Sequence, residues 1–155
     1  MVDKFILKLI VDNTRGVMAR IATLLARKGY NIASICVGKH IVEGESSIVL
    51  TIYGNENEVE TAKNTLGKIV NVISISSTHS SEGVEREHCL VKIAKDGKEK
   101  KILSAKDFEA RKVQEGAGFM VFEFVDYPPR VNEFVSLVLR ECRVIDISRS
   151  GTNAI

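Results

Sequence analysis

One short segment of the sequence combines residues that could bind a small charged molecule. It covers residues 12–18, DNTRGVM, between an apolar run and a segment with helical periodicity. The first amide groups of a helix lack intrahelical acceptors and carry partial positive charge, so such a turn can bind a carboxylate. Gly16 has no Cβ and lets a ligand approach the backbone. Asn13 offers a donor and an acceptor, which suit an α-amino acid.

The same segment has a purely structural interpretation. Asn13 or Thr14 could cap the helix by accepting a hydrogen bond from its first turn, and Gly16 could simply ease the turn. On pattern alone, capping is the simpler interpretation. The binding hypothesis therefore needs support from the rest of the chain.

Motifs typical of catalysis are missing from the sequence. It contains no GxxxxGK[ST] phosphate loop, no GxGxxG, no GxSxG and no HExxH. The three histidines have no metal-ligand spacing, and the three cysteines form no CxxC pair. We therefore expect no catalytic residues, no metal site and no disulfide framework, and we expect the cysteines to act as small buried hydrophobes.

The overall charge argues against nucleic acid or an anionic membrane as the main partner. Lys and Arg number 22 and Asp and Glu number 20 in 155 residues, which gives a formal charge of +2, and there is no Trp. The first residues show no basic segment before a long apolar run. No apolar stretch approaches the roughly 20 residues that span a bilayer. These features predict a cytoplasmic protein without a membrane partner.

The elements that position the turn follow the order strand, helix, strand, strand, helix, strand. Alternation of apolar residues predicts strands over residues 5–11, 30–39, 46–53 and 70–76. Apolar stripes at helical spacing predict helices over 17–28 and 56–66, which Gly29 and Gly67 end. This order is typical of the split βαβ, ferredoxin-like arrangement.

The same order occurs a second time after a polar stretch that begins at Thr78. Strands are predicted over residues 88–94, 110–114, 119–125 and 144–147. A helix over 98–107 would have a thin apolar face, whereas a helix with Pro129 in its first turn has a clear stripe. We predict an α+β fold of two tandem ferredoxin-like βαββαβ domains, residues 1–78 and 85–155, with a linker over 79–84.

Four segments resemble a known family. Residues 13–21, NTRGVMARI, are similar to the N-x-x-G-V-[LM]-x-R-[IV] entry of ACT domains. Residues 27–38, RKGYNIASICVG, closely resemble the R-[RK]-G-[YF]-N-I-x-S-[IL]-x-V-G stretch of acetolactate synthase small subunits. Residues 84–93 and 144–151 resemble that family's V-E-R-E-x-x-L-[VI]-K-[VI] block and its closing [IV]-x-[ED]-[VI]-x-R-[ST]-G. The resemblance covers nearly the whole chain, including a second domain that generic ACT proteins lack.

The resemblance implies a regulatory subunit in branched-chain amino-acid biosynthesis, without catalytic residues of its own. It would activate a separate catalytic subunit and mediate its feedback inhibition. The first domain would be an ACT domain, which pairs side by side in a homodimer. Valine, or sometimes leucine or isoleucine, would bind at that interface. Thiamine diphosphate, FAD and magnesium would belong to the catalytic subunit, so no cofactor is expected in this chain.

The family's effector site carries over to this chain by position. Asn13 and Gly16 would hold the polar head of the effector, with help from the backbone amides of Val17 and Met18. The pocket would be completed by Asn31 and Ile32 of the partner subunit. Arg15 departs from the pattern, since a proline or a small residue often precedes the glycine, and this long cation affects the expected affinity.

Other functions remain as alternatives. A free-standing ACT amino-acid sensor that regulates another enzyme or a transcription factor would share the first domain, but the blocks at 84–93 and 144–151 argue against it. An RNA-binding ferredoxin-like module would need exposed aromatic residues on its central strands, where this sequence has few. A small enzyme would need a catalytic constellation, and we find none.

Overall fold

The computed structural model describes residues 3–103, 105 and 107–155, and the chain divides into two compact units. The first unit extends to Val84 and also includes Thr152–Ile155. The second unit is Glu85–Gly151. Each unit carries the order strand, helix, strand, strand, helix, strand, which confirms the predicted α+β class with two ferredoxin-like halves.

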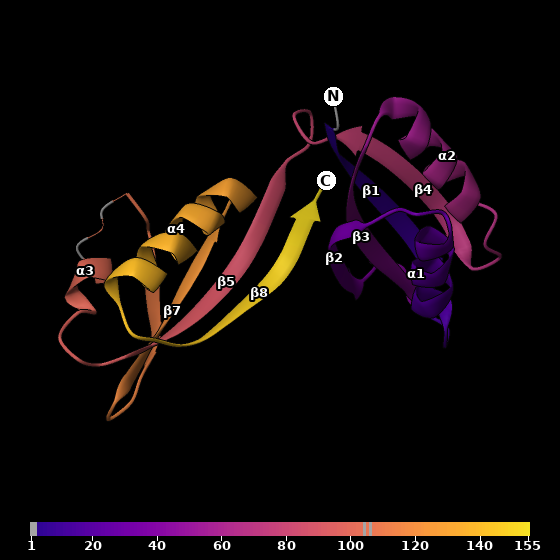
Figure 1. The fold of residues 1–155 in the computed structure, drawn as a ribbon. Coiled ribbons are helices and arrows are strands. Elements are labelled where there is room, and N and C mark those ends of the chain that lie inside the picture. The colour runs from indigo at the N-terminus through magenta and orange to yellow at the C-terminus, as the bar shows by residue number, and fades with distance from the viewer. Residues whose placement is uncertain (1–2, 104, 106) are drawn as a thin grey trace. The chain divides into compact units, whose positions relative to one another are not determined.

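The first unit is an antiparallel four-stranded sheet with two helices packed on one face (Figure 1). The strand order is β2-β3-β1-β4, so β2 and β4 are the edge strands. The strands are β1 (Asp3–Asp12), β2 (Ile32–Lys39), β3 (Glu45–Gly54) and β4 (Val72–His79). The helices are α1 (Val17–Arg27) and α2 (Glu56–Leu66).

The core of the first unit lies between the sheet and the helices, where the apolar periodicities predicted it. Alternate residues of β1 and β3 point toward the helices, and each helix contributes a stripe of residues spaced by three or four. The buried members of the two helical stripes are Val17, Ile21 and Leu25 on α1 and Val59, Ala62 and Leu66 on α2. Gly29 has a φ of 79°, so α1 ends at a left-handed glycine as predicted.

The second unit has a four-stranded sheet in the order β6-β7-β5-β8. Its strands are β5 (Glu85–Ala94), β6 (Arg111–Glu115), β7 (Phe119–Asp126) and β8 (Val144–Ala154), and its helices are α3 (Lys100–Leu103) and α4 (Pro128–Glu141). The last three residues of β8, 152–154, belong to the first unit. Pro128 and Pro129 occupy the first turn of α4, where a missing N–H costs nothing. Phe124 and Phe134 pack with ring centroids 4.6 Å apart in the core.

Three predicted segments differ from the structure. The helix predicted over 98–107 is a single turn, Lys100–Leu103, because its apolar face is thin; residues 104 and 106 of that prediction lie outside the described residues. The strand predicted over 70–76 begins at Val72 and continues through Thr78 and His79, which pair with Ile6 and Phe5. The last strand continues past residue 147 to Ala154.

Among the described residues, no helix is long and apolar enough to cross a membrane.

Candidate functional site

The turn between β1 and α1 is held in place by its backbone. The Asn13 amide donates to the Gly44 carbonyl at 2.7 Å, and the Thr14 amide donates to the Asp12 carbonyl at 2.8 Å. Gly16 is the N-cap residue of α1, with a φ of 85° and a ψ of −4°. That conformation is left-handed, and a side chain would strain it. The glycine is therefore needed for the turn itself.

The start of α1 is left uncapped by any described side chain. Gly16 cannot provide a side-chain oxygen, and neither Asn13 nor Thr14 caps the helix. The capping role considered for those two residues is therefore wrong, because the cap position falls two or three residues further along the chain. The Val17 amide donates a long hydrogen bond to the Thr14 carbonyl at 3.5 Å, whereas the Met18 and Ala19 amides have no acceptor among the described residues.

The start of α2 shows the opposite arrangement in the same unit. The Asn55 side chain accepts from the Glu58 amide at 3.0 Å, and the Glu58 carboxylate accepts from the Asn55 amide at 2.8 Å. This capping box satisfies the Glu58 amide, whereas the amide at the matching position of α1, that of Ala19, has no acceptor among the described residues. Two carboxylates, Glu56 and Glu58, also lie in the first turn of α2, whereas the first turn of α1 contains no acidic residue.

The surroundings of the α1 terminus favour a carboxylate ligand. Arg15 and Arg20 are both exposed beside it, and the helix dipole adds partial positive charge. The Asn13 side chain is exposed and makes no hydrogen bond with the described residues. An exposed amide beside free backbone donors can bind both charged groups of an amino acid, accepting from the ammonium and donating to the carboxylate.

A second set of hydrogen bonds, centred on Asn71, holds the end of β1 beside the turn. The Asp12 amide donates to the Asn71 carbonyl at 2.9 Å, and the Asn71 side-chain amide donates to the Asp12 carboxylate at 3.4 Å. Arg20 donates to the Asn71 side-chain carbonyl at 2.6 Å. Asn71 therefore joins the end of β1 to α1 from 59 residues away in sequence. Sequence reasoning missed it, since no local pattern marks an asparagine before a strand.

The other two predicted site residues lie at the far end of α1. Asn31 is exposed just before β2, and Ile32 is half-buried as the first residue of that strand. The 11 residues of α1 separate them from the turn, a distance of roughly 16 Å along the helix. One chain therefore brings Asn13, Gly16 and the first amides of α1 together but leaves Asn31 and Ile32 apart from them.

Strand β2 is an edge of the sheet and exposes apolar side chains. Ile35 and Val37 on this strand are 37% and 50% exposed. An edge strand with unpaired backbone groups and apolar side chains is a template for pairing with another strand. Asn31 and Ile32 lead into this edge, so a strand that pairs there would come close to them.

In the second unit, two of the motif blocks meet across the sheet. Arg149 donates two hydrogen bonds to the Glu87 carboxylate, both at 2.7 Å, and the His88 amide donates to the Ser150 hydroxyl at 3.1 Å. Glu87 is buried, and its hydrogen bonds raise the pKa of Arg149. The pair is a fixed, satisfied contact that stabilises the pairing of β5 with β8.

The cysteines show no sign of activation. Cys89 and Cys142 are buried, as predicted, and Cys36 is half-buried. Burial raises the pKa of both the Cys89 and the Cys142 thiol, which keeps them protonated. In the part of the chain that the structure describes, no group of three His, Cys, Asp or Glu side chains could hold a metal ion.

Family models match both halves of the chain. An AHAS small subunit-like ACT domain matches residues 7–74, and a model for the small subunit of acetolactate synthase matches residues 86–155. The two matches follow the order of the two structural units.

Individual proteins match over nearly the whole chain. A probable acetolactate synthase small subunit of Archaeoglobus fulgidus is 30% identical over 150 residues, which cover 96% of this chain and 93% of that protein. The acetolactate synthase small subunit of Mycolicibacterium smegmatis is 28% identical over 94% of this chain and 86% of its own. The crystal structure of the Thermotoga maritima small subunit superposes with a TM-score of 0.90 at 28% identity, covering 98% of this chain and 96% of that one.

Proposed function

The chain belongs to the family of acetolactate synthase small subunits, the regulatory partners of a catalytic subunit, and we propose that it binds a branched-chain amino acid and thereby sets the activity of that catalytic subunit. The observation that carries the proposal is the N-terminus of α1, which has no side-chain cap and no acidic residue in its first turn. The side chain of Asn13, which makes no hydrogen bond with the described residues, lies beside it. No catalytic role and no cofactor are assigned to this chain. Thiamine diphosphate, FAD and magnesium belong to the catalytic subunit in this proposal.

The polar head of the effector binds at the β1–α1 turn. Its carboxylate accepts hydrogen bonds from the first amides of α1, those of Val17 and Met18, where the helix dipole and Arg15 add positive charge. The Val17 amide gives up its long bond of 3.5 Å to the Thr14 carbonyl in exchange. Asn13 orients the ammonium group through its side-chain oxygen. Gly16 leaves the approach open, since a Cβ built there has nothing within 4 Å.

The apolar part of the effector requires a second copy of the chain. Met18 and Ile32 are half-buried against the core and each keeps part of its surface free. They lie at opposite ends of α1 in one chain, but a homodimer paired through β2 brings the turn of one copy toward Asn31 and Ile32 of the partner subunit. The exposed Ile35 and Val37 on this edge support the pairing.

Regulation follows from differential affinity. An effector that prefers one arrangement of the dimer shifts the equilibrium toward it, with a coupling of about 1–3 kcal/mol in typical cases. The catalytic subunit must then alter the affinity for the effector by the same factor. Feedback inhibition results when the effector favours the arrangement that activates the catalytic subunit less.

The match over residues 86–155 favours this function over a free-standing ACT sensor. A sensor needs only the first unit, whereas the second unit matches the acetolactate synthase small subunit specifically.

Calorimetric titration tests the proposal through reciprocity. Valine, leucine and isoleucine would each be titrated into the chain alone and into the chain saturated with its catalytic subunit. We expect one of them to bind and its affinity to change by roughly 5- to 150-fold when the catalytic subunit is present. An affinity that stays the same would exclude equilibrium coupling, and no binding in either state would exclude the effector site.

A further inference from the structure

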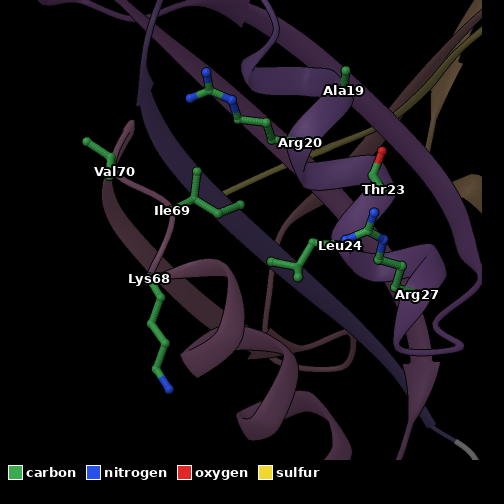
Figure 2. A pocket seen from close by; sticks show the side chains of 8 residues that line it. All are labelled: Ala19, Arg20, Thr23, Leu24, Arg27, Lys68, Ile69 and Val70. Carbon is green, nitrogen blue, oxygen red and sulfur yellow. The ribbon is translucent and has the colours of Figure 1, made fainter.

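A groove separate from the β1–α1 turn lies on the helical side of the first unit. It runs between α1 and the connection from α2 to β4, with a volume of about 510 Å³. Figure 2 shows its lining, in which Leu24 and Ile69 face each other and cationic side chains surround them. None of the residues predicted for the effector site lines it.

The floor of the groove is apolar and open to solvent. Leu24 and Ile69 are half-buried against the core, while Val70 beside them is 93% exposed. A large apolar side chain that projects almost completely from the surface suits a protein partner better than an enclosed small molecule. The floor would bury the apolar side chains of a docked segment.

The rim of the groove is positively charged. Arg20, Arg27 and Lys68 line it, and no carboxylate does. Among the residues that the structure describes, neither Arg27 nor Lys68 has an acidic partner. By contrast, Lys63 in the last turn of α2 pairs with Glu60 at 2.6 Å. The groove therefore presents unneutralised cations around an apolar centre.

We propose that this groove docks a segment of the catalytic subunit that carries carboxylates on either side of an apolar side chain. The inference rests on the proposed function, which supplies the partner, and on the charge of the groove, which supplies the chemistry. Acidic side chains would pair with Arg27 and Lys68, and the apolar side chain would cover Val70 and Ile69. Complementary charge of this kind mainly speeds and orients association.

Hydrogen bonds connect the groove to the proposed effector turn. Arg20 lines the groove and donates to Asn71, which in turn contacts Asp12 at the end of β1. A change in the turn when an effector binds can therefore alter the position of Arg20. Through Asn71 and Arg20, effector binding would therefore change how the groove contacts the docked segment.

The test is a charge reversal of the rim in the full chain. The double variant Arg27→Glu/Lys68→Glu would be compared with Lys98→Glu/Lys100→Glu, which makes the same charge change at exposed positions of the second unit. Binding of the catalytic subunit would be measured at low and moderate salt. We expect the groove variant to bind at least about tenfold more weakly, with a shallower salt dependence, and the control to bind like the wild type.

Two further readouts identify the occupant. Val70→Ser should weaken binding of the catalytic subunit by about threefold or more, since it removes exposed apolar area without touching the core. The thermal shift with a branched-chain amino acid should persist in all the variants.

Equal binding of the catalytic subunit by the groove variant and the control would overturn the inference alone. A groove variant that instead changes the mass of the free chain would assign the groove to a second copy and overturn it too. Failure of the wild-type chain to bind the catalytic subunit would overturn the proposed function and the inference together.

Discussion

Two sets of charged side chains, one in each unit, differ in whether they have partners within the chain. In the second unit, Glu115 is paired with Lys95 and Lys112, and Glu141 with Lys101 and Arg140. In the described part of the first unit, Arg15, Arg27 and Lys68 have no acidic partner. Charges that are paired within the chain stabilise it, whereas unpaired charges remain available to a ligand or a partner. We propose that the unpaired cations of the β1–α1 turn and of the groove bind carboxylates, while the ion pairs of Glu115 and Glu141 support the second unit.

The two helices of the first unit repeat this contrast on a smaller scale. α2 caps its own first turn with Asn55 and Glu58, while α1 begins at Gly16 without a side-chain cap. The N-terminus of α2 is thus capped by side chains of the chain itself, whereas that of α1 is not. A substitution at one helix or in one unit should therefore change either stability or effector affinity and leave the other property unchanged.

The largest effect is expected from Gly16→Asp. The new side chain places a carboxylate where the effector's carboxylate binds, so we expect affinity for the effector to fall by about 100-fold or more. Because Gly16 has a left-handed backbone, the substitution should also lower the free energy of unfolding by about 1–2 kcal/mol. Calorimetry and urea unfolding measure the two effects.

Gly97→Asp is the matched control for that variant. Gly97 has a φ of 93°, so the same strain and charge enter the second unit, away from the turn. It should lose similar stability and keep its effector affinity. Loss of binding in both variants would mean that the effect is global and that Gly16 has no special role.

Arg149→Ala should destabilise the second unit without affecting the first. The change leaves the buried Glu87 carboxylate without its bidentate partner. Breaking a fully buried pair costs about 3–5 kcal/mol, and the partial exposure of Arg149 reduces our expectation to about 2 kcal/mol in urea unfolding. Arg140→Ala, which removes an exposed pair, should cost less than about 0.5 kcal/mol. A changed effector affinity in Arg149→Ala would contradict the division of roles.

The substitutions Asn13→Ala and Asn55→Ala compare the two helix starts directly. Asn13→Ala removes a free side chain, so we expect stability to be unchanged and effector affinity to fall by about tenfold, or about 1.4 kcal/mol. Asn55→Ala removes a cap and should cost about 1 kcal/mol of stability with no change in effector affinity. If the two variants behaved alike, the distinction between an open and a closed helix start would be wrong.

The smallest effect is expected from acid. Hydrogen bonds from Lys112 and Lys95 lower the pKa of Glu115 from 4.5 to about 2, and those from Lys101 and Arg140 lower the pKa of Glu141 to about 2. A lowered folded-state pKa means that the stabilisation is present above pH about 4.5 and is lost as the pH falls toward 2.

The double variant Glu115→Gln/Glu141→Gln tests the acid effect by melting at pH 7, 4.5 and 2.5. Its melting temperature should lie below that of the wild type at pH 7, and the gap should be clearly smaller at pH 2.5, since the two folded-state pKa values lie near 2. Glu43→Gln, at an exposed carboxylate without a cationic partner among the described residues, should show no such gap. A gap of the same size at pH 2.5 as at pH 7 would show that the ion pairs are not its cause.

Regular periodicity made most of the fold predictable from sequence. The stripes of α1, α2 and α4 mark three helices, and alternation marks the strands of both sheets. The helix around α3 was overpredicted in length because the apolar residues of that segment form only a thin stripe, of which Ile102 is buried. The extension of β4 through His79 was missed because Thr78 and His79 are polar, and their pairing with β1 overrides their local preference.

The candidate site was predictable only in its local part. Asn13 and Gly16 of the β1–α1 turn lie three positions apart in one short motif, so the sequence could identify them. Whether Asn13 caps α1 depends on the residue at which the helix begins, which differs by only a few positions between the two interpretations. Asn71 and Lys68 lie in the connection between α2 and β4, far from the turn in sequence, and only the fold shows that they reach the site or the groove.

A thermal-shift titration of the wild-type chain tests the central claim most directly. Valine, leucine and isoleucine would be compared with serine, whose side chain is small and polar. At 100 times its dissociation constant, a ligand of the folded state adds about 2.7 kcal/mol, which raises the melting temperature of a chain this size by about 5 °C or more. We predict such a rise with at least one branched-chain amino acid and none with serine. No rise with any of them, or an equal rise with serine, would contradict a branched-chain effector site at the start of α1.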